Sequence, residues 1–384
     1  MSTATSGSDA HDARSGALAS PGSRTARGNR IEAIDFARGL AVCLMILSHG
    51  VNGLLQFEQF TDWGMVPIHA ITKFSASLFI MVFGIALAVA FVPKVGADDW
   101  PRRRNRLLIR GLVVLAVYKA LTVVEMYALY EPEDIVEALT YQNFPSYVEI
   151  LGFYAIALLW IPFFLPLWAR MPVPLQWASP VVAGLASWWL LANFDFWGVP
   201  QLQALIVEHA DYYTWGQLSR LPLVLAGLLV GALMLRWYRD TRTRLGLAGA
   251  IALLGVVLLA WFAARADGDL GGALLAAARN AGKHPPELTF MLFSVGGALV
   301  LLGLAIAGGE LLARALRPVT LIGSDALQAF IFHILVIFVL FRDQLGYMHT
   351  VSYEYALGLT LGLIAATAAW IWLIQWVQRR WSQR

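Results

Sequence analysis

The sequence has few charged residues and only one cysteine. Asp, Glu, Lys and Arg make up 14% of the 384 residues, whereas a water-soluble domain carries about 25%. This low charge excludes an ordinary soluble domain for most of the chain, and the mean hydropathy of +0.64 indicates that lipid surrounds it. The single Cys43 excludes an intrachain disulfide framework and a cysteine-based zinc cluster.

Several functional patterns are also missing. The net charge of +3 gives no strongly basic surface for nucleic acid. The seven histidines are scattered without i,i+4 pairs, and the chain has no Gly-x-Ser-x-Gly elbow. We therefore expect no nucleic-acid partner, no metal site and no serine-hydrolase chemistry. We find no internal repeat and no second, soluble domain.

Residues 1–29 differ in composition from the rest. They are mainly Ser, Ala, Gly and Arg, and they lack the continuous apolar stretch of a signal peptide. We predict a disordered cytoplasmic tail over 1–29 and one membrane-embedded domain over 30–384.

This domain contains about ten apolar runs close to the length of about 20 residues that crosses a bilayer. The runs lie near 34–56, 70–92, 106–129, 147–168, 176–193, 217–237, 244–264, 288–307, 318–341 and 354–378. Arg-rich segments follow an even number of runs, so the positive-inside rule predicts that both termini are cytoplasmic. The sequence thus predicts an all-α, multi-pass protein of the cell membrane, in which the fifth run is the weakest.

The first apolar run, "RIEAIDFARGLAVCLMILSHGVN", carries three ionisable residues: Asp35, Arg38 and His49. Eleven residues are close to three helical turns, so Arg38 and His49 share one helix face, about 16 Å apart along the axis. Such a face must border a bundle interior or a wet cavity rather than lipid. A neutral imidazole can take a proton near pH 7, which makes His49 a candidate general base. Alternatively, His49 packs, and Asp35 and Arg38 form an i,i+3 ion pair.

This stretch resembles the first-helix signature of integral-membrane acyltransferases, namely the acyltransferase type 3 family and its heparan-α-glucosaminide N-acetyltransferase-like relatives. The shared pattern is Arg, ten residues and His, here Arg38 to His49. An Arg-x-x-Arg motif at the start of the third helix of the type 3 family is matched by Arg103 and Arg106. Three later stretches are similar to motifs of the glucosaminide branch: 219–234, 283–304 and 321–337.

The resemblance implies transfer of an acyl group, acetyl above all, from cytoplasmic acyl-CoA to a hydroxyl or amine of a sugar or envelope glycoconjugate. Acetyl-CoA would be a cosubstrate, and no cofactor would stay bound. His49 would act as general base or carry the acyl group, assisted by Arg38 and Asp35. The human-type enzymes have a His before a Trp-Asn-Gly stretch, whereas no His precedes Asp62-Trp63-Gly64 here. That difference leaves His69 as a minor candidate.

Other polar residues are candidates for substrate binding. Arg103, Arg106 and Arg110 lie on one helix face, and their guanidinium groups suit the phosphates of coenzyme A; a topology anchor would have the same composition. Candidates for the acceptor site are Lys73, Arg220, Lys283, His284 and His333. In the alternative interpretation Lys73 only snorkels, "KHPPE" is a rigid turn, and His333 is a packing residue.

Further expectations concern the class of protein, its buried charges and its oligomeric state. Alternatively, the protein is a transporter that uses the same buried charges as a proton or substrate pathway. A transporter of this size would more often have two related halves or paired broken helices, and the sequence shows neither. Lys119 and Glu125 lie in the third run, and we expect them to form structural ion pairs with other helices. The chain could also form a homodimer.

Overall fold

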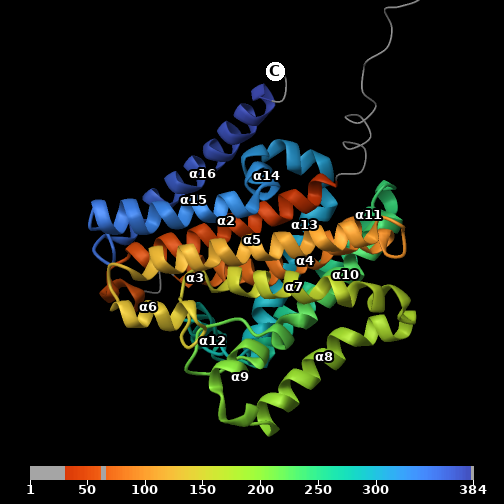
Figure 1. Ribbon diagram of the computed structural model, residues 1–384, viewed down its shortest axis with the longest axis horizontal. Coiled ribbons are helices and arrows are strands. Elements are labelled where there is room, and N and C mark those ends of the chain that lie inside the picture. Colours follow the sequence, from red (N-terminus) through yellow and green to blue (C-terminus); the bar gives the residue numbers. More distant parts are fainter. Residues whose placement is uncertain (1–30, 62–65, 382–384) are drawn as a thin grey trace, which may run out of the picture. The chain divides into compact units, whose positions relative to one another are not determined.

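The structure is a computed structural model that describes residues 31–61 and 66–381. Glu32–Arg384 form one compact unit, and the described part of this unit is helical, without a β-strand (Figure 1). The predicted all-α class is therefore confirmed. The predicted tail 1–29 and the Asp62-Trp63-Gly64 stretch lie outside the described residues.

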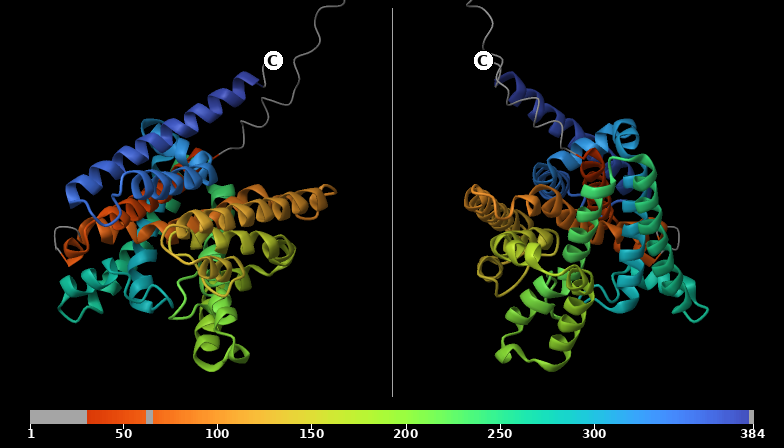
Figure 2. Two further views of the ribbon diagram at one scale, coloured as in Figure 1. Left: turned by 60° about the vertical axis from the view of Figure 1, so that its left-hand side comes forward. Right: turned by 90° about the vertical axis from the view of Figure 1, so that its right-hand side faces the viewer.

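The helices follow one another with short connections. Their bounds are α2 Glu32–Leu54, α3 Val66–Thr72, α4 Phe74–Ala90, α5 Trp100–Met126, α6 Pro132–Leu139, α7 Glu149–Arg170, α8 Val173–Asn193, α9 Pro200–Val207, α10 Gln217–Trp237, α11 Thr241–Ala264, α12 Leu270–Ala278, α13 Leu288–Ala315, α14 Arg317–Ser324, α15 Ala326–Leu335 and α16 Tyr353–Trp381. A π-helical segment, Val336–Gln344, continues α15. Helices α5 and α7 pack together, as do α11 and α13 (Figure 2).

Nine segments of the described chain are long and apolar enough to cross a membrane, which agrees with a multi-pass membrane protein. Helix α8, with 21 residues, coincides with the weak fifth run but is not among the nine. It exposes large apolar side chains such as Trp188 and Trp189. Whether α8 crosses the membrane determines whether the two termini lie on the same side, so their cytoplasmic location stays a prediction.

Helix α2 lies in the middle of the bundle and packs against α4, α13, α14 and α16. Its crossing with α14 is very close: a Cβ atom on Gly39 would lie 1.9 Å from the carbonyl oxygen of Val319, and one on Gly323 would lie 1.8 Å from that of Asp35. Only glycine permits backbones to approach this closely. The crossing holds the polar face of α2 against protein instead of lipid.

Candidate active site

His49 and His333 are hydrogen-bonded to each other between α2 and α15. His49 Nδ1 lies 3.2 Å from His333 Nε2, and the two rings stack with centroids 5.4 Å apart. His333 Nδ1 lies 3.0 Å from the carbonyl oxygen of Ala329, which can only accept a hydrogen bond. A neutral His333 therefore carries its proton on Nδ1 and accepts at Nε2 the proton of His49 Nδ1–H. This arrangement leaves the lone pair of His49 on Nε2, the state that a base or nucleophile requires.

Asp35 and Arg38 form the i,i+3 contact expected from the sequence, with 3.4 Å between Arg38 Nη1 and Asp35 Oδ1. The same guanidinium nitrogen donates to the carbonyl oxygen of Gly323 at 3.1 Å. Arg38 is therefore anchored at the close crossing of α2 and α14.

Arg38 also lines a mainly apolar cavity of about 180 Å³, here called the Arg38 cavity. Its wall is formed by Arg38, Phe79, Phe83, Ala86, Leu87, Phe91, Leu107, Arg110, Val114, Leu151, Tyr154, Leu158, Ser324, Asp325, Ala326, Leu327 and Phe330. The described lining includes Arg110 but neither Arg103 nor Arg106. Arg103 instead pairs with Asp99 at 2.5 Å.

A second cavity, of about 450 Å³ and here called the Glu149 cavity, has a far more polar wall. The lining residues are Ser48, His49, Asn52, Val66, His69, Ser146, Tyr147, Glu149, Tyr213, Leu275, Ala278, Arg279, Asn280 and Lys283. A small adjoining cavity of about 40 Å³ brings Lys73 next to His49, Glu149 and Lys283.

His49 lies between the two cavities. It lines the Glu149 cavity, and its ring packs against the ring of Phe330 with 6.2 Å between the ring centroids. Phe330 in turn lines the Arg38 cavity. A group transferred from a ligand in one cavity to a ligand in the other would pass beside His49.

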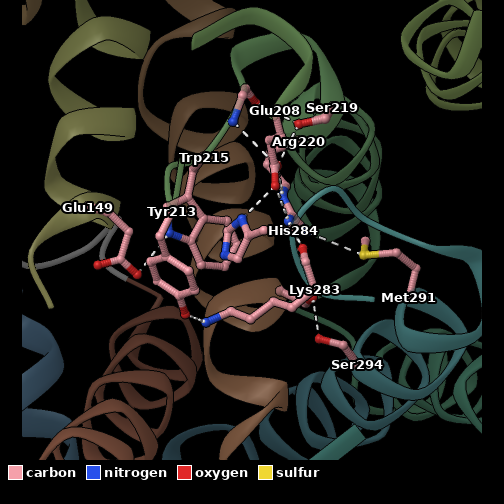
Figure 3. A network of polar contacts seen from close by, with 12 residues as sticks. Glu149, Glu208, Tyr213, Trp215, Ser219, Arg220, Lys283, His284, Met291 and Ser294 are labelled. Carbon is pink, nitrogen blue, oxygen red and sulfur yellow. Dashed lines mark hydrogen bonds and ion pairs between the residues drawn. The ribbon is translucent and has the colours of Figure 1, made fainter. Parts of the chain in front are cut away.

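A network of buried charges, the Glu208 cluster, consists of Glu208, Ser219, Arg220 and His284 (Figure 3). Arg220 Nε and Nη2 donate to the Glu208 carboxylate at 2.6 and 3.0 Å, and His284 Nδ1 lies 2.6 Å from Oε2. Burial alone would raise the pKa of Glu208, but Arg220 and His284 outweigh it and lower the pKa to about 2. For His284 burial has the larger effect, and its pKa falls to about 4 despite the nearby carboxylate.

The Glu208 cluster also holds the backbone of Lys283. Arg220 Nη2 donates to the Lys283 carbonyl oxygen at 2.7 Å. The Lys283 ammonium group then reaches the hydroxyl of Tyr213 and lies over the rings of Tyr213 and Trp215 (Figure 3). Burial lowers the pKa of Lys283 below its usual range. The cluster thus fixes a basic side chain at the wall of the Glu149 cavity.

The residues named from the sequence divide into two groups. Lys73, Lys283 and His333 lie near His49, whereas Arg220 and His284 belong to the Glu208 cluster and line neither of the two cavities in the described chain. His69 lies in the wall of the Glu149 cavity. Glu149 and Glu208 carry no recognisable signal in the sequence, because each resembles any acidic residue in a loop or at a helix start.

The expectation of ion pairs for Lys119 and Glu125 is wrong. Lys119 donates to the carbonyl oxygen of Ala138 at 2.9 Å and lies 3.4 Å from the ring centroid of Tyr141. The Glu125 carboxylate accepts the backbone N–H groups of Ser146 and Tyr147 at 2.6 and 3.1 Å. Backbone groups thus satisfy charges that the sequence suggested were paired, and Glu125 fixes a turn at the wall of the Glu149 cavity.

No three His, Cys, Asp or Glu side chains of residues 31–61 and 66–381 are arranged to hold a metal ion.

In comparisons with known proteins, the family model described as heparan-alpha-glucosaminide N-acetyltransferase, catalytic, matches residues 30–263. No curated protein matches the chain. The matched range includes α2 with His49 and the arginines of α5, and it covers more than half of the sequence. The protein therefore belongs to the heparan-alpha-glucosaminide N-acetyltransferase catalytic family.

Proposed function

We propose that the protein transfers an acetyl group from cytoplasmic acetyl-CoA to a hydroxyl or amine of a sugar or envelope glycoconjugate. Membership of the acetyltransferase family supports the reaction class. The observation that carries the proposal is the position of His49, which is held by His333 between an apolar cavity with two arginines and a polar cavity.

The Arg38 cavity suits the donor. Its aromatic and aliphatic wall fits the slim pantetheine arm, while Arg38 and Arg110 offer charge-assisted hydrogen bonds to phosphate oxygens. Arg106 and Arg103 lie one and two turns from Arg110 towards the start of α5, on the same helix face. We propose that Arg103, Arg106 and Arg110 bind the phosphates of coenzyme A.

The Glu149 cavity suits the acceptor, because its wall offers charged and hydrogen-bonding side chains. In a direct transfer, the acceptor hydroxyl or amine gives its proton to His49 Nε2 while its oxygen or nitrogen attacks the thioester carbon. The new C–O or C–N bond forms as the C–S bond breaks, and the imidazolium returns the proton to the leaving thiolate.

The same geometry serves a second route. There His49 Nε2 attacks the thioester carbon itself, and the acetyl group stays on the imidazole until the acceptor takes it. In both routes His333 orients His49 and fixes which nitrogen carries the lone pair. Arg38 and Asp35 secure the other end of the same helix face.

The test replaces His49 by Asn in detergent-purified protein supplied with radiolabelled acetyl-CoA. We expect turnover to fall about 10²–10⁴-fold, with the affinity for coenzyme A nearly unchanged. His209→Asn is the matched control, because His209 lies in neither cavity wall of the described chain. Rapid denaturation distinguishes the routes, since only the second leaves label on the wild-type protein.

A folded His49→Asn protein that transfers acetyl at the wild-type rate would exclude His49 as base and as carrier. A transporter would instead move substrate into vesicles without any turnover of acetyl-CoA. Measuring both activities on the same preparation therefore separates the two interpretations.

A further inference from the structure

Glu149 is a buried carboxylate with an unused oxygen. It is the first residue of α7 and 5% exposed. Its Oε1 accepts the indole N–H of Trp215 at 3.0 Å, whereas Oε2 has no hydrogen-bond partner among the described residues. A buried carboxylate oxygen without a partner is costly in free energy. A ligand with an O–H or N–H group would remove this cost.

The position of Glu149 indicates which ligand this is. Glu149 and His49 line the same two adjoining cavities, so a molecule that reaches the base also reaches Glu149. Figure 3 shows Glu149 and Lys283 on either side of Tyr213 and Trp215. The Lys283 ammonium group is directed to the Tyr213 hydroxyl, and in the described chain it donates no hydrogen bond to Glu149 Oε2. The carboxylate thus stays available to a ligand.

A second unused acceptor lies in the same wall. The Oδ1 atom of Asn280 is buried and has no hydrogen-bond partner in the part of the chain that the structure describes. Two acceptors without donors call for a ligand that brings several donors. Lys283 and Arg279 supply donors for its oxygen atoms. A polyhydroxylated molecule carries several hydroxyl groups on neighbouring carbons, each able to donate and to accept a hydrogen bond, whereas a simple alcohol or amine carries only one such group.

We infer that Glu149 is the positioning and specificity residue for the acceptor, whose class is a sugar with a free hydroxyl or amino group beside the one that is acetylated. The neighbouring group donates to Glu149 Oε2 and so turns the reacting oxygen or nitrogen towards His49 Nε2. This inference rests on the proposed function and adds the residue that positions and selects the acceptor.

The test uses Glu149→Gln, which keeps Oε1 and its bond to Trp215 but replaces Oε2 by an NH₂ donor. Acceptor kinetics are measured with methyl glucoside, methyl glucosaminide and their monodeoxy analogues as probes. We expect the KM for the parent glycosides to rise at least about tenfold, with a smaller change in kcat and an unchanged KM for acetyl-CoA. Glu133→Gln, an exposed glutamate of α6, should behave as wild type.

The deoxy analogues separate recognition from a structural role. One deoxy analogue should raise the acceptor KM of the wild type by the same factor by which Glu149→Gln raises the KM for the parent glycoside. In the variant this analogue should raise the KM no further, because both changes remove the same contact. If Glu149 had only a structural role, Glu149→Gln would lower the thermal midpoint and would change the KM for every analogue by the same factor.

Three results would overturn the inference: an unchanged acceptor KM in Glu149→Gln, an equal loss for every analogue in both proteins, or a wild-type enzyme that acetylates none of the glycosides. Acetyl-CoA hydrolysis without sugar is measured alongside. If it still depends on His49, only the inference about Glu149 fails; if no His49-dependent turnover occurs at all, the proposed function fails with it.

Discussion

Glu208 and Glu149 are both buried glutamates next to basic side chains, but their surroundings differ. The Glu208 carboxylate accepts hydrogen bonds from Gly216 N, Ser219 Oγ, Arg220 and His284. Glu149 has one such bond, and its second oxygen is unused in the described chain. The hydrogen-bonding capacity of the Glu208 carboxylate is used by protein groups, whereas Glu149 can still accept a hydrogen bond from a ligand.

This difference indicates two separate tasks. The Glu208 cluster joins the end of α9 and the start of α10, which are 11 or 12 residues apart, to the segment before α13, which lies 76 residues beyond Glu208. Glu208 itself has a φ of 74°, a region that a non-glycine residue enters only when its surroundings enforce it. The cluster therefore stabilises the wall of the Glu149 cavity, and Glu149 acts inside that cavity.

The largest effect on folding is expected for Glu208→Gln. This change leaves Arg220, which is 1% exposed, without a counter-charge, and breaking one partner of a buried ion pair costs about 3–5 kcal/mol. The free energy of unfolding, measured by denaturant titration in detergent, should fall by this amount. Glu149→Gln should change it far less, because the bond to Trp215 remains.

The matched control is Glu310→Gln, which breaks the exposed i,i+4 pair with Arg314. A surface pair contributes about 1 kcal/mol or less. Equal stability of Glu208→Gln and Glu310→Gln would show that the Glu208 cluster does not hold the fold, and the contrast with Glu149 would disappear.

A pH effect of intermediate size follows from His284. Burial lowers its pKa from 6.5 to about 4. Between pH 6.5 and 4 the unfolded chain therefore binds a proton at His284 that the folded chain does not bind. The stabilisation is fully present above pH 6.5 and is lost as the pH falls towards 4, by up to about 3 kcal/mol. We expect the thermal midpoint of wild type to drop over this range, most clearly above pH 4.5, where Glu208 does not yet contribute.

His284→Gln keeps an N–H donor for Glu208 but cannot take a proton, so its thermal midpoint should vary less between pH 6.5 and 4. The difference between the two profiles isolates His284 from the other titrating groups. Parallel profiles in both proteins would contradict the assignment.

The sequence predicts local features well. The eleven-residue spacing that aligns Arg38 with His49 depends only on helical geometry, and the run 217–237 coincides with α10. The run 318–341 is less regular: Asp325, with φ −140°, ends α14, and its carboxylate accepts the Gln328 N–H at the start of α15. A polar residue inside an apolar run can thus divide one predicted helix into two.

Partners that are distant in sequence could not be predicted. His49 and His333 are separated by 284 residues, and each alone can be read as a packing residue. The sequence makes Arg220 and His284 candidates for the acceptor site, and the structure pairs both with Glu208. Composition identifies buried charges, whereas only tertiary contacts decide which of them are already satisfied.

The arginines of α5 extend the same comparison to the donor side, where the expected effects are smallest. Arg110 lines the Arg38 cavity and is exposed, so Arg110→Ala should leave the free energy of unfolding unchanged. It should weaken coenzyme A binding by about 1.5–3 kcal/mol, the contribution of one hydrogen bond to a charged group. Calorimetric titration of the purified protein with coenzyme A measures this difference.

A series along α5 then tests how far the phosphates reach from the cavity. Arg106→Ala should weaken binding less than Arg110→Ala, because Arg106 lies one turn outside the described cavity wall. Arg103→Ala should have the smallest effect, since Asp99 already pairs with Arg103 at 2.5 Å. Arg104 lies on another face of α5, over the ring of Phe163, and provides the control Arg104→Ala, which should bind as wild type does. The opposite order, with Arg103→Ala most damaging, would place the phosphates at the start of α5 and leave the Arg38 cavity without a role in holding them.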